Sequence, residues 1–233
     1  MKSESNKLAV RGELALIAMV IMNSAGVLLM LHSGSGISAI SSVPYGFQQV
    51  FPQLTLGTWT YMFQGLLVLV LMLLRRKFMP SYLFSFVVGF VFGKLMDLEK
   101  PFIDALPLNI PMRVLYFVLS YLILCFGISL GNRCGLPITP TDLFPREMAD
   151  ITKLPYARVK ITFDLTCLIT TAVITFVGVG AIRGLGIGTV VAACTMGKGI
   201  SFIGSLLDKR LTFHSVLDLS LIHISEPTRR TPI

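Results

Sequence analysis

Six apolar stretches, each about as long as a membrane crossing, alternate along the chain with polar connections. A helix needs about 20 mostly apolar residues to cross the hydrocarbon of a bilayer. The stretches that meet this length are approximately Leu14–Leu31, Leu56–Leu74, Ser81–Leu98, Met112–Leu130, Ile161–Gly180 and Leu185–Leu207. The pattern therefore predicts an all-α polytopic membrane protein with six transmembrane helices.

Two connections are too long to be simple turns. The first, Ser33–Thr55, carries no Asp, Glu, Lys or Arg and is broken by glycines and by Pro44. A re-entrant or interfacial segment fits this composition, and a short extracellular linker is the alternative. The second follows Gly131. In it, Thr139-Pro140-Thr141-Asp142 predicts a helix start, with Thr139 at the N-cap and Pro140 at the first helical position, and a short helix to about Ile151.

Composition supports a membrane location. Of 233 residues, 54% are hydrophobic and 14% are charged, and the mean hydropathy is +0.77. A soluble domain carries about 25% charged residues, so most of this surface is expected to face the lipid bilayer. The net charge of +8 is interpreted as the Lys and Arg excess of cytoplasmic loops, with no nucleic-acid partner. The four cysteines form no CxxC pair and predict neither a disulfide framework nor a metal site.

The distribution of Lys and Arg predicts the orientation. With the N-terminus inside, the inner segments would hold Lys2, Lys7, Arg11, Arg75, Arg76, Lys77, Arg133, Arg146, Lys153, Arg158, Lys160, Lys209 and Arg210. The outer connections would hold only Lys100 and Arg183. Because cytoplasmic loops are the positively charged ones, both termini are expected to be cytoplasmic.

The chain contains an internal repeat. Phe86–Lys94 and Val190–Lys198 are both apolar runs that end in Gly-Lys, and Gly26–Leu29 is echoed by Gly127–Leu130, with offsets between 101 and 104 residues. We therefore divide a single membrane domain, residues 1–218, into repeat one (about 12–98) and repeat two (about 112–210). Each repeat holds three spans, an odd number, so the second enters the membrane from the opposite side. Such inverted repeats build several transporter folds.

Five polar residues within or beside the apolar stretches are candidates for a substrate or ion pathway: Lys198, Asp164, Lys94, Gln64 and Asp97. Charged groups inside a membrane are costly and are usually functional. The structural alternatives are snorkelling of Lys94 to the headgroups, an interfacial role for Asp164, and an ion pair of Asp97 with Lys94. Four glycines, Gly89, Gly93, Gly197 and Gly199, are predicted to permit close helix packing, with the spans Ser81–Leu98 and Leu185–Leu207 facing each other.

No pattern of catalytic residues is present. The chain has no Ser-His-Asp set, HExxH motif or paired catalytic carboxylates. The glycine-rich run Gly178–Thr189 lacks the βαβ context of a nucleotide-binding loop and is interpreted as a tight turn. An enzyme, a cofactor and a metal are therefore not expected.

The last residues, 219–233, resemble the translation of a sequencing adapter. We interpret them as an artefactual tail and exclude them from the fold.

Several segments carry a family resemblance. Gly127–Leu130 continuing to Pro137–Asp142, then Asp164-Leu165, and Gly184–Thr189 followed by Gly197, together resemble the YczE/YyaS/YitT family of bacterial integral membrane proteins over about residues 12–210. The resemblance implies a multi-span protein of the bacterial inner membrane, without an assigned substrate. The first repeat departs from the pattern, because Ser33-Gly34-Ser35-Gly36 stands where the family motif is polar and charged.

Two functional hypotheses remain open. Inverted repeats with intramembrane Lys and Asp favour a secondary transporter or permease for an unknown small solute. The near absence of charge in the first repeat favours a non-transporting scaffold or regulator that supports a partner complex. A homo-oligomer is compatible with either hypothesis.

Overall fold

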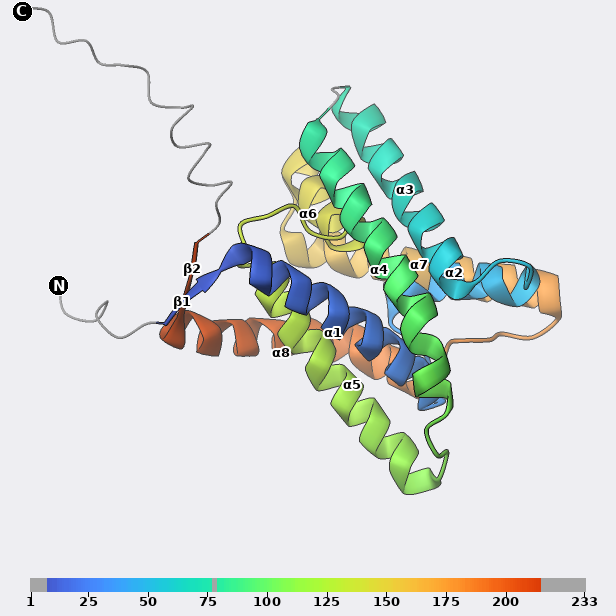
Figure 1. Cartoon of the computed structure of the whole chain (residues 1–233). Coiled ribbons are helices and arrows are strands. Elements are labelled where there is room, and N and C mark those ends of the chain that lie inside the picture. Colours follow the sequence, from blue (N-terminus) through green and yellow to red (C-terminus); the bar gives the residue numbers. More distant parts are fainter. Residues whose placement is uncertain (1–7, 77–78, 215–233) are drawn as a thin grey trace, which may run out of the picture.

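The computed structural model describes residues 8–76 and 79–214 as a helical protein with one small sheet (Figure 1). Its elements are β1 (Leu8–Arg11), α1 (Gly12–His32), α2 (Ala39–Val50), α3 (Leu56–Arg75), α4 (Pro80–Asp104), α5 (Ile110–Gly131), α6 (Pro140–Thr152), α7 (Tyr156–Val179), α8 (Ile187–Arg210) and β2 (Leu211–His214). In the described chain, six helices (α1, α3, α4, α5, α7 and α8) are long and apolar enough to cross a membrane. The prediction of an all-α membrane protein with six spans is confirmed.

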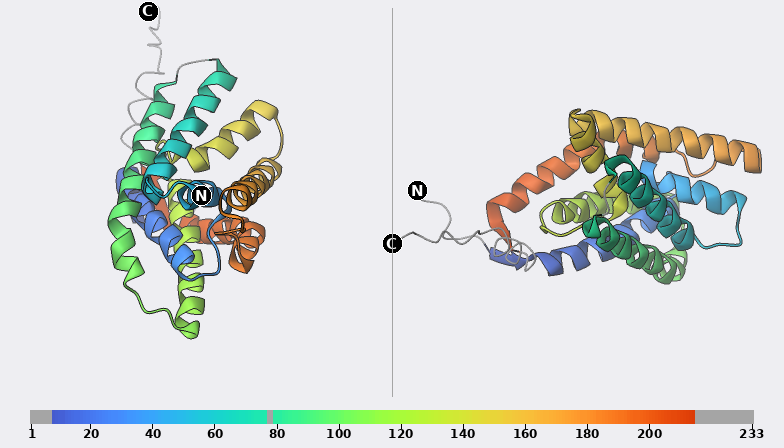
Figure 2. Two further views of the ribbon diagram at one scale, coloured as in Figure 1. Left: turned by 90° about the vertical axis from the view of Figure 1, so that its right-hand side faces the viewer. Right: turned by 90° about the horizontal axis from the view of Figure 1, so that it is seen from above.

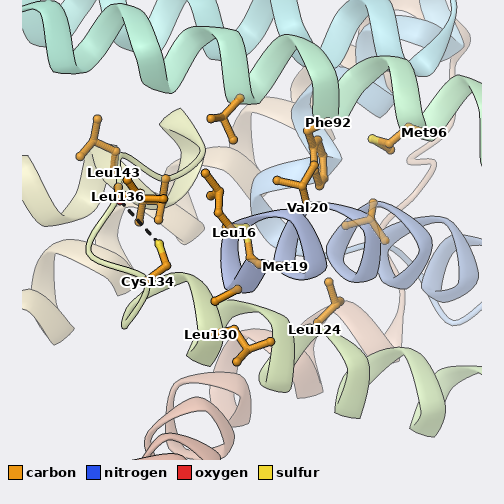
Figure 3. Packing of buried hydrophobic residues seen from close by; sticks show 14 of the residues in the cluster. Leu16, Met19, Val20, Phe92, Met96, Leu124, Leu130, Cys134, Leu136 and Leu143 are labelled. Atoms are coloured by element: carbon orange, nitrogen blue, oxygen red, sulfur yellow. Dashed lines mark hydrogen bonds between the residues drawn. The ribbon is translucent and has the colours of Figure 1, made fainter. Parts of the chain in front are cut away.

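Helices α1 and α5 form the centre of the molecule. They pack along each other, α4 packs on α1, and α8 packs on α5. Figure 3 shows Met19 and Val20 of α1 between Phe92 of α4 and Leu124 and Leu130 of α5. The prediction that the spans now seen as α4 and α8 face each other is therefore wrong. Helix α4 packs on α1 and helix α8 packs on α5, so each lies against a different member of the central pair. The two central helices have the highest mean hydropathy of the six long apolar helices.

Small residues set the distance between α1 and α5. A Cβ atom added at Gly26 would lie 3.0 Å from the Leu124 side chain, and one added at Gly127 would clash with Oδ1 of Asn23. Glycine therefore permits this close approach. The two contacts are also reciprocal, since Gly26 precedes Gly127 and Asn23 precedes Leu124 by the same 101 residues.

Most other helix contacts come in similar matched pairs. The packing of α2 on α7 has a counterpart in the packing of α6 on α3. Likewise, the packing of α2 on α3 has a counterpart in the packing of α6 on α7. One pair is unequal: α3 packs closely on α4, whereas α7 and α8 make only marginal contact. Figure 2 (right) shows these two helices extending in different directions with little overlap. The inverted orientation of the repeats stays a prediction.

The two long connections each contain a short helix. Helix α2 has 12 residues and α6 has 13, which is too short to cross a bilayer. The expected helix after Thr139 is confirmed as α6. The Ser33–Thr55 segment is more than a linker, because α2 buries Ser42, Val43 and Gly46. Two glycines with positive φ, Gly34 (75°) and Gly36 (113°), turn the chain between α1 and α2.

The ends of the described chain meet in a two-stranded parallel sheet. Leu8 pairs with Leu211, and Arg11 pairs with His214. These strands were not predicted from the sequence. Parallel pairing places both ends of the described chain on one face of the molecule, and which side of a membrane that is stays a prediction. The proposed artefactual tail, 219–233, lies outside the described residues.

Candidate functional site

Both short helices begin beside the middle of a long helix and end near its end. At the start of α2, the Ser42 hydroxyl lies 2.7 Å from the Thr171 hydroxyl of α7. At the end of α2, a Cβ added at Gly178 of α7 would clash with the Val50 side chain. Helices α2 and α7 therefore run in the same direction, and α2 covers the second half of α7.

Helix α6 has the same relation to α3. Its first residue, Pro140, and Gln64 of α3 both border Gly89: a Cβ added there would lie 3.0 Å from Pro140 Cδ and would clash with Gln64 Oε1. Further along α6, Glu147 and Asp150 form ion pairs of 2.6 and 2.9 Å with Arg75 at the end of α3. Helix α6 thus begins at the middle of α3, where the predicted site residue Gln64 lies.

The first turns of the two short helices are built alike. The Ser38 hydroxyl donates to Ser41 at 2.9 Å, and the Thr139 hydroxyl donates to the Asp142 carboxylate at 2.8 Å. Each pair joins the N-cap to the third helical residue, and the pairs are 101 residues apart. A helix N-terminus carries a partial positive charge. Only α6 places an acidic side chain against it.

A group of charged residues surrounds the start of α6. The Lys160 ammonium lies 2.7 Å from the Asp164 carboxylate one turn later on α7. Their side chains are 25% and 13% exposed, and both charges act on Asp142. Burial raises the pKa of Asp142, opposed by Lys160 and the Thr139 hydroxyl. We call Asp142, Lys160 and Asp164 the charged cluster. It holds two carboxyl groups and one ammonium.

Gln64 is the most completely enclosed polar residue at this place. Its side chain is fully buried, and within the described part of the chain neither amide atom has a hydrogen-bond partner. An unsatisfied buried polar group costs about 1–3 kcal/mol, and a polar ligand between α3, α4 and α6 would remove this cost. An amide can donate to and accept from the same polar ligand.

A cavity adjoins the charged cluster. It has a volume of about 750 Å³ and is lined by Asn132, Asp142, Arg146, Glu147, Ala149 and Asp150. Sequence reasoning missed Glu147, which accepts a hydrogen bond from Tyr82 of α4 and the ion pair from Arg75. These contacts join residues 65 and 72 positions apart, so no local pattern could reveal them. The described residues contain no group of three or more His, Cys, Asp or Glu side chains suited to a metal ion.

Comparison with known proteins identifies a family. Residues 10–205 match the family described as "Family of unknown function (DUF6198)". The chain belongs to this family. No curated protein and no solved structure matches the chain. The family description assigns no activity, so the site of this DUF6198 protein must be interpreted from its own residues, and the YczE/YyaS/YitT resemblance stays a prediction.

Two predicted pathway residues of this DUF6198 chain lie away from the charged cluster. Lys94 is exposed and lies over the rings of Tyr61 and Phe90, 5.6 and 5.7 Å from their centroids. Asp97 does not pair with Lys94 among the described residues. It accepts hydrogen bonds from the Thr55 hydroxyl (2.7 Å) and the Gly57 amide (2.9 Å) at the start of α3, and it borders a second cavity of about 420 Å³.

The predicted packing glycines divide into two kinds. Gly89 and Gly93 lie against α3, and Gly199 lies against α5, where an added Cβ would be 2.8 Å from Cys125 Sγ. Gly197 is not a packing residue among the described residues, since an added Cβ would meet nothing within 4 Å. Its neighbour Lys198 is exposed and has no ion-pair partner in the described chain. The expectation that Lys198 faces a cavity or carboxylate is not met in this conformation.

Proposed function

We propose that the protein is a secondary transporter or permease for a small polar solute, with its binding site at the start of α6 between α3 and α7. The observation that carries this proposal is the gathering of the charged cluster and the unpartnered Gln64 at the point where a short helix begins beside two long ones. Charged residues inside a membrane are costly, and they mark substrate and ion pathways.

The arrangement of helices supports the proposal. Inverted-repeat transporters bind substrate where discontinuous helices begin within the membrane, between the repeats. Here α6 belongs to repeat two and starts against α3 of repeat one, and α2 starts against α7 in the converse manner. The adjoining cavity gives a route for water and solute from one face to Asp142.

The proposal is tested by asking whether water reaches Gln64. In a background with Cys194→Ser, Gln64→Cys is treated with a membrane-impermeant thiol reagent in sealed vesicles of both orientations. A transport site should react from the face that bears the larger cavity. Leu71→Cys is the matched control, because Leu71 lies two turns further along α3, is equally buried and is surrounded by apolar residues. It should not react.

The same variant can find the solute class. Small amines, carboxylates and neutral polyols are added in turn, and a solute that occupies the site should slow the labelling of the Gln64→Cys protein. If the Gln64→Cys thiol is as unreactive as the Leu71→Cys thiol from both faces, the site is dry, and the non-transporting scaffold becomes the better hypothesis.

A further inference from the structure

One face of α8 is uncovered at the middle of the helix. We call it the open face and define it by Gly197, Lys198 and Ser201, all of which are exposed. A Cβ added at Gly197 would have no neighbour within 4 Å, and Lys198 has no hydrogen-bond or ion-pair partner among the described residues. Because an ammonium at the centre of a spanning helix is costly in lipid, another helix is needed to cover this face.

The equivalent face of α4 is covered at its glycine: Gly93 is buried, and the exposed Lys94 lies beside an aromatic ring. Lys94 and Gly93 precede Lys198 and Gly197 by 104 residues. A Cβ added at Gly93 would lie 2.6 Å from the Gly57 carbonyl oxygen of α3, and Lys94 lies over the Tyr61 ring of the same helix. The same surface is thus filled by α3 in repeat one and left open in repeat two, where α7 is the counterpart of α3.

The contacts of α2 and α6 show approximately which parts of α3 and α7 correspond. Val50, near the end of α2, touches Gly178. Asp150, which corresponds to Gln49 beside Val50, binds Arg75. Gly178 therefore corresponds to about Arg75, an offset of 103. Applied to Tyr61, this approximate offset places its counterpart within about one turn of Asp164, the acidic residue of α7, so a repeat-two counterpart of the Lys94–Tyr61 contact would bring Lys198 close to Asp164.

We propose that the protein has a second conformation in which α7 closes onto the open face of α8, and Asp164 exchanges Lys160 for Lys198. This inference rests on the proposed function: the present structure, with α3 on α4 and α7 away from α8, is one of two states in which the repeats exchange shapes. Closure joins opposite charges and covers Gly197. The connection between the helices begins at Gly180 and includes Gly184, with φ of 75° and 79°, which can absorb the change.

Helix α7 fits the open face better than a second copy does. A two-fold dimer centred on this face would set one Lys198 near the other, because such an interface repeats the same patch on both partners. Helix α7 instead offers a carboxylate at the required position and is connected directly to α8. Apart from its contact with α2, its burial is low, so α7 and α2 can move together without exposing a large core: 17% of the apolar stretch of α7 is buried, against 61% in α1.

Cross-linking tests the closure. Asp164→Cys and Lys198→Cys are combined in a chain whose four native cysteines are replaced, and the membranes are treated with a permeant bismaleimide. The expected result is a cross-link within one chain, found by mass spectrometry of the linked peptides. Tyr61→Cys with Lys94→Cys is the matched control and should link, since these side chains already meet. Adding Gly197→Leu, which fills the open face, should lower the α7–α8 yield several-fold and leave the control yield unchanged.

The wild-type chain offers a second measurement that needs no substitution. Cys167 corresponds to Gln64 and Cys194 to Phe90, and Gln64 lies against Gly89 beside Phe90. A short bifunctional thiol reagent should therefore join Cys167 to Cys194 within one chain. If the control pair links while neither α7–α8 pair does, or if the links join two chains, the closure is refuted. Neither result bears on whether water reaches the thiol of Gln64→Cys, so the proposed function can stand without this inference.

Discussion

At the scale of single residues, Asp142 shows how the fold acts on ionisation. Burial raises its pKa, and the charge of Asp164 adds to the effect, against Lys160 and the Thr139 hydroxyl. A carboxyl group whose pKa is higher in the folded than in the unfolded state, where it is about 3.9, favours folding when protonated. The free energy of unfolding should therefore fall as the pH rises through these two values.

Asp142→Asn should remove this loss. The amide keeps an oxygen that can accept from Thr139 and cannot ionise, so the variant should gain thermal stability relative to wild type at about pH 7 and lose that gain near the unfolded pKa of about 3.9. Melting temperatures in detergent, followed by Trp59 fluorescence, measure it. Asp150→Asn should behave oppositely, because hydrogen bonding to Arg75 lowers the pKa of Asp150, so its stabilisation is present above the unfolded pKa and is lost at acid pH. Parallel melting curves for all three proteins would contradict the assignment.

The sequence pointed to Asp164 and Gln64 but could not show what they meet. Both stand out as polar residues in apolar stretches, which is a local signal. Their placement at the start of α6 depends on how α3 and α7 pack around that helix, and this is a tertiary property. Lys94 and Lys198 show the same limit. Both lysines of the repeated Gly-Lys motif are exposed, but Lys94 lies over aromatic rings and no ring contact of Lys198 is found among the described residues.

At the scale of helices, the two copies of the Gly-Lys motif lead to opposite predictions for the replacement of glycine by alanine. Gly93→Ala puts a Cβ 2.6 Å from a backbone oxygen of α3, which cannot move away by rotation of a side chain. Overpacking of this kind costs about 1–3 kcal/mol. Gly197→Ala meets open space and gains helix propensity of about 1 kcal/mol. Thermal melts should therefore show a loss of stability for Gly93→Ala and none for Gly197→Ala. A comparable loss in both would mean that another surface already covers Gly197 in the resting protein.

Hydrophobic runs predicted the long helices well and their ends less well. Helix α4 continues through Pro101 to Asp104, well beyond the expected Leu98. The polar residues Lys100 and Asp104 form an ion pair one turn apart in this extension, and a hydrophobic run does not reveal such a polar end. Helix α2 was not predicted, although Ser38 stands at its N-cap, because its sequence carries no long apolar run. It exists because α7 supplies an apolar and hydroxyl-bearing surface on which its small residues pack.

At the scale of the whole molecule, the number of spans followed from the pattern of apolar stretches. Which helices lie at the centre of the molecule did not follow from that pattern. Gly26 and Gly127 were visible as a repeat, yet a repeat does not say which helix its glycines face. The structure answers this through reciprocal contacts: Gly26 meets Leu124 and Gly127 meets Asn23. Two helices related in this way must cross at equivalent points, so α1 and α5 occupy the centre and the Gly-Lys helices are displaced to either side.

Contacts between helix ends and connections place these segments on two faces of the molecule. The predicted topology can therefore be tested. On one face, Arg133 binds Asp208, Arg75 binds Asp150, and β1 pairs with β2. On the other, His32 lies 3.1 Å from the Leu106 carbonyl oxygen, and Arg183 donates to Gln49 at 3.2 Å. The first face carries the many basic residues and is predicted to be cytoplasmic.

Single cysteines at exposed positions of the connections should report these faces in intact cells. Gln53→Cys and Pro107→Cys should react with an impermeant maleimide before permeabilisation, and Lys153→Cys only after it. Reversal of all three would leave the two faces intact and overturn only the orientation drawn from the charge count. Labelling of Gln53→Cys and Pro107→Cys from different sides would be more serious, since it would remove one crossing between them. Repeat one would then no longer hold an odd number of spans, and both the inverted relation and the approximate correspondence of Asp164 with Tyr61 would fail with it.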